Sequence, residues 1–199
     1  MGKFCITTIS TANAYQYFIP MFVYSTKRAY PSAHVKVFVL GKLRQPIKDI
    51  LQEIKDLHMV DTDWEVIESA LSSYPVRWHT PNAIRFLIPE KAFREFKYVF
   101  ITDADFIYFE HSPSLLSFYR GIMKRSKLPY AACRSTVKKP YRKSISPAGW
   151  RAEFTRLVGG GVLINRAAWY KSCDKQIHRY RKLLIAGKPD KIDNHLLRS

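Results

Sequence analysis

Short apolar runs alternate with amphipathic stretches along the first third of the chain. Cys5–Ile9 and Val35–Leu40 are runs rich in β-branched residues, and the stretch between them is long enough for a crossover helix. This pattern predicts a βαβ unit. Gln45–Leu57 carries apolar side chains at spacings of three and four, which predicts an amphipathic helix, and Trp64–Glu68 alternates as a half-buried strand does.

The same alternation continues through the rest of the chain. Thr80 followed by Pro81 is a good helix start, and we expect that helix to run to about Lys91. Tyr98–Ile101 is an unbroken apolar run, as in a central parallel strand that is covered on both faces. The remaining expected elements are a helix capped by Ser112-Pro113, strands at Tyr130–Cys133 and Val162–Ile164, and a helix over Arg166–Ile185. Alternating strands and helices predict an α/β fold with a mostly parallel central sheet flanked by helices.

Composition narrows the class of protein further. A chain of 199 residues suits one domain spanning residues 1–199, and a hydrophobic share of 47% is too high for a disordered chain. No apolar run approaches the roughly 20 residues that a membrane-spanning helix needs. The cysteines, Cys5, Cys133 and Cys173, are odd in number and widely spaced, so we expect a cytoplasmic protein.

Charge is distributed very unevenly along the chain. Residues 1–110 carry 13 Lys and Arg against 12 Asp and Glu, whereas residues 111–199 carry 20 against 4, which is a net charge of +16 out of a total of +17. A basic half of this kind attracts phosphates, anionic lipids or acidic glycans. Lys138–Lys143, with Trp150 and Arg151 behind it, mixes cations and aromatic rings in the way that such binders do. We therefore expect an anionic acceptor or a peripheral site at the inner face of an anionic membrane.

Two carboxylates stand where the central apolar strand ends. Asp103 and Asp105 are two residues apart, so an extended chain would point both to one side. Carboxylates held this close repel each other unless a cation neutralises them, and hard oxygen ligands suit Mn²⁺ or Mg²⁺. The carboxyl ends of strands are also where ligands collect in open α/β sheets. The pair predicts a divalent metal that carries a diphosphate; the alternative is a pair of ordinary turn residues.

Several motifs follow one another in a set order along the chain. Arg85-Phe-Leu-Ile-Pro-Glu90 precedes the strand that closes in Asp103-Ala-Asp105. The others are Thr7, Thr8, Ser10 and Thr11 after the first strand, the turn Gly159-Gly160-Gly161 with the strand to Asn165, and the later acidic motif Asp193-Asn194-His195. Together they resemble the core of the GT-A glycosyltransferases, which are Rossmann-like, and especially those of family 8, which have a similar arginine-bearing segment and Asp-x-Asp strand.

The resemblance implies a role for each matching residue. Asp105 would coordinate Mn²⁺ directly, Asp103 would hold the ribose and support the metal, and Arg85 would contact the nucleotide-sugar donor. The first-strand hydroxyls Thr7, Thr8, Ser10 and Thr11 would border the nucleoside, and Gly159, Gly160 and Gly161 would let the backbone approach the sugar. Asp193 would lie near the transferring sugar or the acceptor hydroxyl. The structural alternatives are an Arg85–Glu90 ion pair, a plain glycine turn, and a helix N-terminal charge at Asp193.

The sequence departs from the family at the third metal ligand. Family 8 enzymes place a His-x-x-Gly-x-x-Lys-Pro-Trp motif after the later acidic motif, but here Gly187-Lys-Pro189 precedes Asp193. His195 is the substitute candidate. An inverting enzyme also needs a carboxylate base, for which Glu153 and Asp193 are the candidates. The family 8 likeness favours a retaining enzyme.

The expected function is therefore metal-dependent transfer of a sugar from a nucleotide-diphosphate sugar, with residues 1–110 as the donor-binding half and 111–199 as the basic acceptor-side half. Two alternatives come from other classes. A phosphohydrolase of the haloacid dehalogenase type also carries Asp-x-Asp after an apolar strand, with Asp103 as its nucleophile. A nucleic-acid binding protein would explain the basic half, and sugar transfer onto nucleic acid would combine both features.

Overall fold

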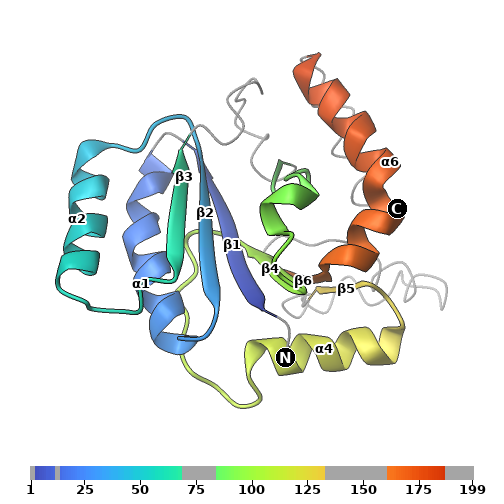
Figure 1. The fold of residues 1–199 in the computed structure, drawn as a ribbon, viewed down its shortest axis with the longest axis horizontal. Helices are drawn as coiled ribbons and strands as arrows, with labels where there is room; N and C mark the ends of the chain where they lie inside the picture. The colour runs from blue at the N-terminus through green and yellow to red at the C-terminus, as the bar shows by residue number, and fades with distance from the viewer. Residues whose placement is uncertain (1–2, 12–13, 69–83, 133–160, 187–199) are drawn as a thin grey trace, which may run out of the picture.

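The computed structural model describes residues 3–11, 14–68, 84–132 and 161–186, which build one central β-sheet with helices on both faces (Figure 1). The strands are β1 (Phe4–Thr11), β2 (His34–Leu40), β3 (Trp64–Glu68), β4 (Tyr98–Thr102), β5 (Tyr130–Ala132) and β6 (Gly161–Asn165). The helices are α1 (Ile19–Ala29), α2 (Gln45–Asp56), α4 (Leu115–Ser126) and α6 (Arg166–Ile185), with the 3₁₀ helices η1 (Ala14–Phe18) and η2 (Glu90–Phe93).

The sheet has the order β3-β2-β1-β4-β6-β5 and is mixed. The first four strands in this order are parallel to one another, β6 runs antiparallel to β4, and β5 runs antiparallel to β6. The predicted α/β class with a mostly parallel sheet is confirmed. The predicted βαβ unit is β1, α1 and β2, in which Cys5 pairs with His34 and Thr11 with Leu40.

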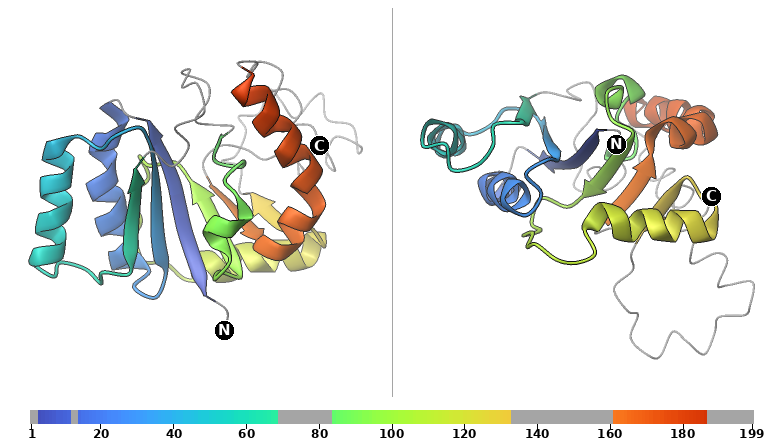
Figure 2. Two further views of the ribbon diagram at one scale, coloured as in Figure 1. Left: turned by 45° about the horizontal axis from the view of Figure 1, so that its top comes forward. Right: turned by 60° about the horizontal axis from the view of Figure 1, so that its bottom comes forward.

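Two hydrophobic clusters fill the space between the sheet and its helices (Figure 2). Helices α1, α2 and α4 cover one face and contribute buried residues such as Phe22, Leu51 and Tyr119. Helix α6 and the segment 84–96 cover the other face, where Trp169 and Phe93 are buried. Because both faces are covered, β4 and β6 read as continuous apolar runs over Val99–Ile101 and Val162–Ile164. None of the described helices is long and apolar enough to cross a membrane.

Two element boundaries differ from the prediction. The expected helix from Thr80 to Lys91 is wrong over its second half, where residues 85–89 form turns and bends. Pro89 has no backbone N–H and disfavours the helical conformation of the residue before it, so the chain restarts as η2 at Glu90. The next helix is capped not by Ser112 but by Ser114, whose side chain accepts a hydrogen bond from the backbone N–H of Ser117.

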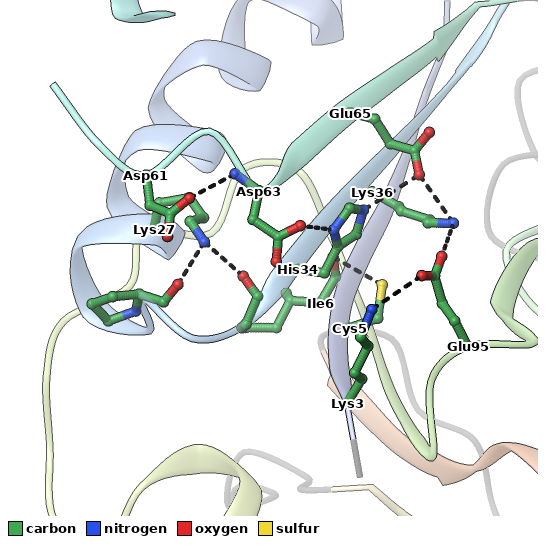
Figure 3. Close-up of polar contacts among 12 residues, drawn as sticks. Lys3, Cys5, Ile6, Lys27, His34, Lys36, Asp61, Asp63, Glu65 and Glu95 are labelled. Atoms are coloured by element: carbon green, nitrogen blue, oxygen red, sulfur yellow. Dashed lines mark hydrogen bonds and ion pairs between the residues drawn. The ribbon is translucent and has the colours of Figure 1, made fainter. Parts of the chain in front are cut away.

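A charged cluster occupies the amino-terminal edge of the parallel strands (Figure 3). The Nζ atom of buried Lys36 lies 3.0 Å from Glu65 and 3.4 Å from Glu95, and it donates to the Ala92 carbonyl at 2.9 Å. His34 contacts Asp63 through Nδ1, and its Nε2 lies 3.3 Å from Glu65. Burial alone would raise the pKa of Glu65, but its contacts with Lys36 and His34 together lower it. These charges stabilise the edge of the sheet opposite the one that carries Asp103 and Asp105.

Candidate active site

The carboxyl end of β4 brings both predicted aspartates to the sheet edge. Val99, Phe100 and Ile101 are buried in the middle of the sheet, so the position of the strand is fixed by packing. The strand ends at Thr102, and the chain then turns at Ala104 and Asp105 instead of staying extended. The extended conformation that would point both side chains to one side therefore does not persist to Asp105. The negative charges of both carboxylates nevertheless raise the pKa of the same phenol, that of Tyr15. The turn therefore keeps the two aspartates close to each other.

Asp103 is held by a buried arginine. The guanidinium Nη1 of Arg85 donates to Oδ1 of Asp103 and forms an ion pair, with 7% of the arginine side chain and 28% of the aspartate side chain exposed. The guanidinium carbon also lies 5.7 Å from the ring centroid of Phe86. The alternative pairing of Arg85 with Glu90 is wrong, because Glu90 pairs with Arg166. A buried cation is stable only with a counter-charge, and Asp103 provides it for Arg85.

Tyr15 is a member of the site that the sequence did not reveal. Burial, a hydrogen bond with Asp105 and the negative charges of Asp105 and Asp103 raise the pKa of Tyr15, against a smaller opposing effect of Arg85. The phenol therefore stays protonated at neutral pH and can donate to the carboxylate. Its ring packs edge-on against Phe18, with 5.3 Å between ring centroids. Tyr15 of η1 thus contacts the turn that follows β4. Local sequence patterns do not predict this tertiary contact.

The hydroxyl residues of β1 lie at different depths. Thr7 and Thr8 lie inside the strand, opposite Ile101 and Thr102 of β4, and both are fully buried. Within the described residues their Oγ1 atoms have no hydrogen-bond partner. Ser10 and Thr11 follow the last residue pair between β1 and β4, which is Thr8 with Thr102, so they lie nearer the carboxyl end of β1. Ser10 is fully buried, and Thr11 is 9% exposed.

Gly161 starts β6 directly opposite Thr102, at the same sheet edge as the aspartates. A Cβ atom at this position would lie 2.6 Å from Cζ of Phe100, so packing against the aromatic ring already requires glycine here. The structure thus provides a packing reason for this glycine. The other predicted site residues, Glu153, Gly159, Gly160, Asp193 and His195, lie outside the described residues.

The donor set at the β4 edge fits a hard divalent cation in part. Two carboxylates with exposed or half-buried oxygens are suitable ligands for Mn²⁺ or Mg²⁺. Arg85 occupies one oxygen of Asp103, whereas Asp105 is exposed. In the part of the chain that the structure describes, no cluster of three or more His, Cys, Asp or Glu residues could hold a metal ion. Among the described residues, this edge therefore offers the oxygens of two carboxylates to a cation, one of them already paired with Arg85.

Comparison with known proteins identifies the fold. The chain is similar to the galactosyltransferase LgtC in complex with donor and acceptor sugar analogues, with a TM-score of 0.51 and 15% identity over 89% of this chain and 65% of that one. It is also similar to the glycosyltransferase GlyE of Streptococcus pneumoniae TIGR4, with a TM-score of 0.54 and 15% identity over 100% of this chain and 42% of that one. A third match is the mannosyltransferase PcManGT of Pyrobaculum calidifontis in complex with GDP-Man and Mn²⁺, with a TM-score of 0.52 and 11% identity over 87% of this chain and 46% of that one.

These similarities show that the chain has the GT-A fold. The chain covers less than two thirds of the length of each of these three proteins. No family model matches the chain, and no curated protein matches it in sequence.

Proposed function

We propose that the protein is a metal-dependent glycosyltransferase that moves a sugar from a nucleotide-diphosphate sugar to an acceptor. The observation that carries this proposal is the acidic pair at the carboxyl end of β4, with Asp103 fixed by buried Arg85, in a chain with the GT-A fold. Open α/β sheets bind their ligands at this edge. The likeness of the Arg85–Asp105 region to family 8 favours membership of that family and retention at the anomeric carbon.

In this proposal Asp105 is the direct ligand of Mn²⁺ and Asp103 is a supporting one. Asp105 is exposed, and its hydrogen bond with Tyr15 sets the orientation of its carboxylate. Arg85 holds Asp103 in place and brings a positive charge to the edge where the donor diphosphate would bind. When bound, the metal supplies positive charge that stabilises the departing diphosphate.

The remaining predicted residues complete the proposed site. Thr11 and Ser10 would border the nucleoside, and Gly161 would line the sugar side of the same edge. Asp193 would lie near the transferring sugar or the acceptor and Glu153 is the second candidate base, while His195 is the candidate third ligand. Substituting each of these last three separately by Ala, with kcat and Mn²⁺ dependence as readouts, assigns or removes its role.

The Arg85–Asp103 ion pair argues against the phosphohydrolase alternative. Pairing with a buried guanidinium withdraws negative charge from the Asp103 carboxylate and so lowers the nucleophilicity that this alternative requires. A covalent aspartyl-phosphate on Asp103, detected by mass spectrometry after incubation with a phosphate ester, would restore that alternative.

For the acceptor we propose an anionic molecule or an anionic membrane surface, because the charge of residues 111–199 exceeds what a small donor requires. Binding to vesicles of phosphatidylglycerol should be salt-sensitive and stronger than binding to phosphatidylcholine. Equal and salt-insensitive binding to both would remove this part of the proposal, and salt-sensitive DNA or RNA binding without sugar transfer would favour a nucleic-acid binding protein.

The donor site is tested by a thermal-shift panel of uridine and guanosine diphospho-sugars with and without Mn²⁺. A ligand that binds only the native state raises the melting temperature. We expect one of these donors to stabilise the wild type only with Mn²⁺, and to have no such effect on Asp105→Ala. The matched control is Asp174→Ala, which removes the same charge from an exposed position on α6 and should respond like the wild type. Equal stabilisation of Asp105→Ala would refute the metal site.

A further inference from the structure

A basic groove lies between α4 and the first turns of α6, away from the acidic pair. Its volume is about 780 Å³. Tyr98, at the start of β4, lines the groove together with side chains of both helices and of the turn that follows α4. The lining residues that carry the argument are Arg120, Gly121, Lys124, Lys127, Asn165 and Ser172.

The groove combines three cations with no acidic side chain. Arg120, Lys124 and Lys127 are exposed, and none of them forms an ion pair with a described acidic residue. No Asp or Glu occurs in α4 or in α6 before Asp174, and the ion pair of Asp174 is made with His178 of its own helix. The Arg120 guanidinium carbon lies 5.3 Å from the Tyr98 ring centroid, which holds this cation at the wall of the groove. Like charges that are gathered without counter-charges repel one another, and a bound anion would relieve the repulsion.

Gly121 gives the groove its depth. It lies inside α4, where glycine costs about 1 kcal/mol relative to alanine. Packing does not require it, because a Cβ atom at this position would meet only Nη1 of the flexible Arg125 side chain, at 3.5 Å. The missing side chain therefore leaves open space in the groove wall rather than relieving a clash.

We propose that this groove is a binding site for phosphate groups, separate from the proposed donor site. Tyr98 starts β4 and Asp103 directly follows its end, so these two residues are separated by roughly 16 Å at a rise of about 3.3 Å per strand residue. Arg and Lys side chains bind phosphate oxygens through charge-assisted hydrogen bonds. The Ser172 hydroxyl donates to the Ala168 carbonyl and Asn165 Oδ1 accepts from the Ala168 backbone N–H, so the donors for a phosphate are the three cations and the Asn165 amide N–H groups.

The size of the groove favours a phosphate ester over a nucleic-acid chain. Pockets of about 300–1,000 Å³ hold small ligands, and a volume of about 780 Å³ accommodates one or two phosphate groups with an organic part. The phosphate can belong to a phospholipid headgroup or to a soluble phosphate ester, which share the same chemistry.

The test uses inorganic pyrophosphate as the first probe and isothermal titration as the readout. The titration is done on full-length Asp105→Ala without divalent metal, so that the proposed donor site does not contribute and the outcome does not depend on sugar transfer. We expect Lys124→Gln/Lys127→Gln to weaken pyrophosphate binding by about tenfold or more, because two charge-assisted contacts are lost. Gly121→Leu should also weaken it, because the new side chain occupies the groove without changing any charge.

The matched control is Arg179→Gln/Lys182→Gln, which removes the same charge from exposed positions farther along α6. Arg179 and Lys182 lie seven and ten residues beyond Ser172, or about 10 and 15 Å along a helix. This control should keep pyrophosphate binding within about twofold of the parent, since a screened charge at that distance contributes little. Equal losses in the control and in Lys124→Gln/Lys127→Gln would overturn the proposal, as would unchanged binding by Gly121→Leu.

A second experiment identifies the source of the phosphate, using vesicles that contain equal amounts of phosphatidylglycerol and phosphatidylcholine. If lipid headgroups occupy the groove, Lys124→Gln/Lys127→Gln loses vesicle binding and pyrophosphate competes with it. If soluble esters occupy it, the same variant loses pyrophosphate binding and keeps vesicle binding. Binding of a single-stranded oligonucleotide at least about tenfold tighter than pyrophosphate, and lost in Lys124→Gln/Lys127→Gln, would replace the phosphate-ester site with a nucleic-acid site.

Discussion

Removing both carboxylates around Lys36 should destabilise the protein far more than removing the lysine. The Nζ atom of Lys36 contacts Glu65, Glu95 and the Ala92 carbonyl, and the lysine side chain is 9% exposed. Glu65→Gln/Glu95→Gln leaves this ammonium buried without a counter-charge. Breaking a buried ion pair from one side costs about 3–5 kcal/mol.

The expected cost is smaller than that full value because the glutamates are 43% and 52% exposed, so water already reaches the network. We expect a loss of about 2–3 kcal/mol. At roughly 2–4 °C per kcal/mol for a chain of this size, the melting temperature should fall by about 5–10 °C. Lys36→Met alone should cost less than about 1 kcal/mol, because the two glutamates it leaves behind can be hydrated.

Urea and thermal unfolding of the double variant, of Lys36→Met and of the triple variant measure these differences. Adding Lys36→Met to Glu65→Gln/Glu95→Gln should restore most of the lost stability, because the unpaired buried charge is removed. The control is Asp174→Asn, which breaks an exposed ion pair and should change stability by less than about 0.5 kcal/mol. A double variant as stable as the wild type, or a triple variant no more stable than the double, would refute the reasoning.

Three further predictions concern pH, packing and the acidic pair. The pKa of Glu65 is lowered in the folded state from its ordinary value of 4.5. Its stabilising contribution is therefore present above pH 4.5 and is lost as the pH falls through the lower folded value. The melting temperature of the wild type should fall more steeply below about pH 5 than that of Glu65→Gln. Gly161→Ala should cost about 1–3 kcal/mol in urea unfolding because its Cβ meets the Phe100 ring, whereas Gly121→Ala should stabilise by up to about 1 kcal/mol, and equal effects would contradict the packing argument. Tyr15→Phe should leave the fold intact by circular dichroism but weaken Mn²⁺-dependent donor binding by about tenfold, since one hydrogen bond to the acidic pair is lost; unchanged binding would remove Tyr15 from the site.

Strands and long helices could be predicted from the sequence because their patterns are set by burial in a covered sheet. Trp64–Glu68 and Arg166–Ile185 have the predicted bounds, and β4 extends the predicted run by one residue. The cap at Thr80 predicts where a helix begins but not where it ends, so the helix expected up to Lys91 is too long. The chain forms a turn at Arg85, whose guanidinium contacts Asp103, and Pro89 prevents the helix from continuing.

The acidic pair could be located in the sequence because it directly follows a buried strand, but its partners could not. Arg85 is 18 residues away in the chain from Asp103, and its pairing depends on how segment 84–96 packs on the sheet. Tyr15 reaches Asp105 from η1 on another element, and the groove of Arg120, Lys124 and Lys127 needs α4 and α6 side by side. Each of these is a tertiary contact between segments with no shared local pattern.

The binding of Mn²⁺ by the acidic pair is measured most directly by electron paramagnetic resonance of the free ion. Titration of the wild type into Mn²⁺ and a nucleotide-diphosphate sugar should reduce the free-ion signal further than the sugar nucleotide does alone, up to one ion per chain. Asp105→Asn should produce no further reduction, whereas Asp174→Asn should match the wild type. An Asp105→Asn variant that depletes the free-ion signal as the wild type does would contradict the proposed metal site.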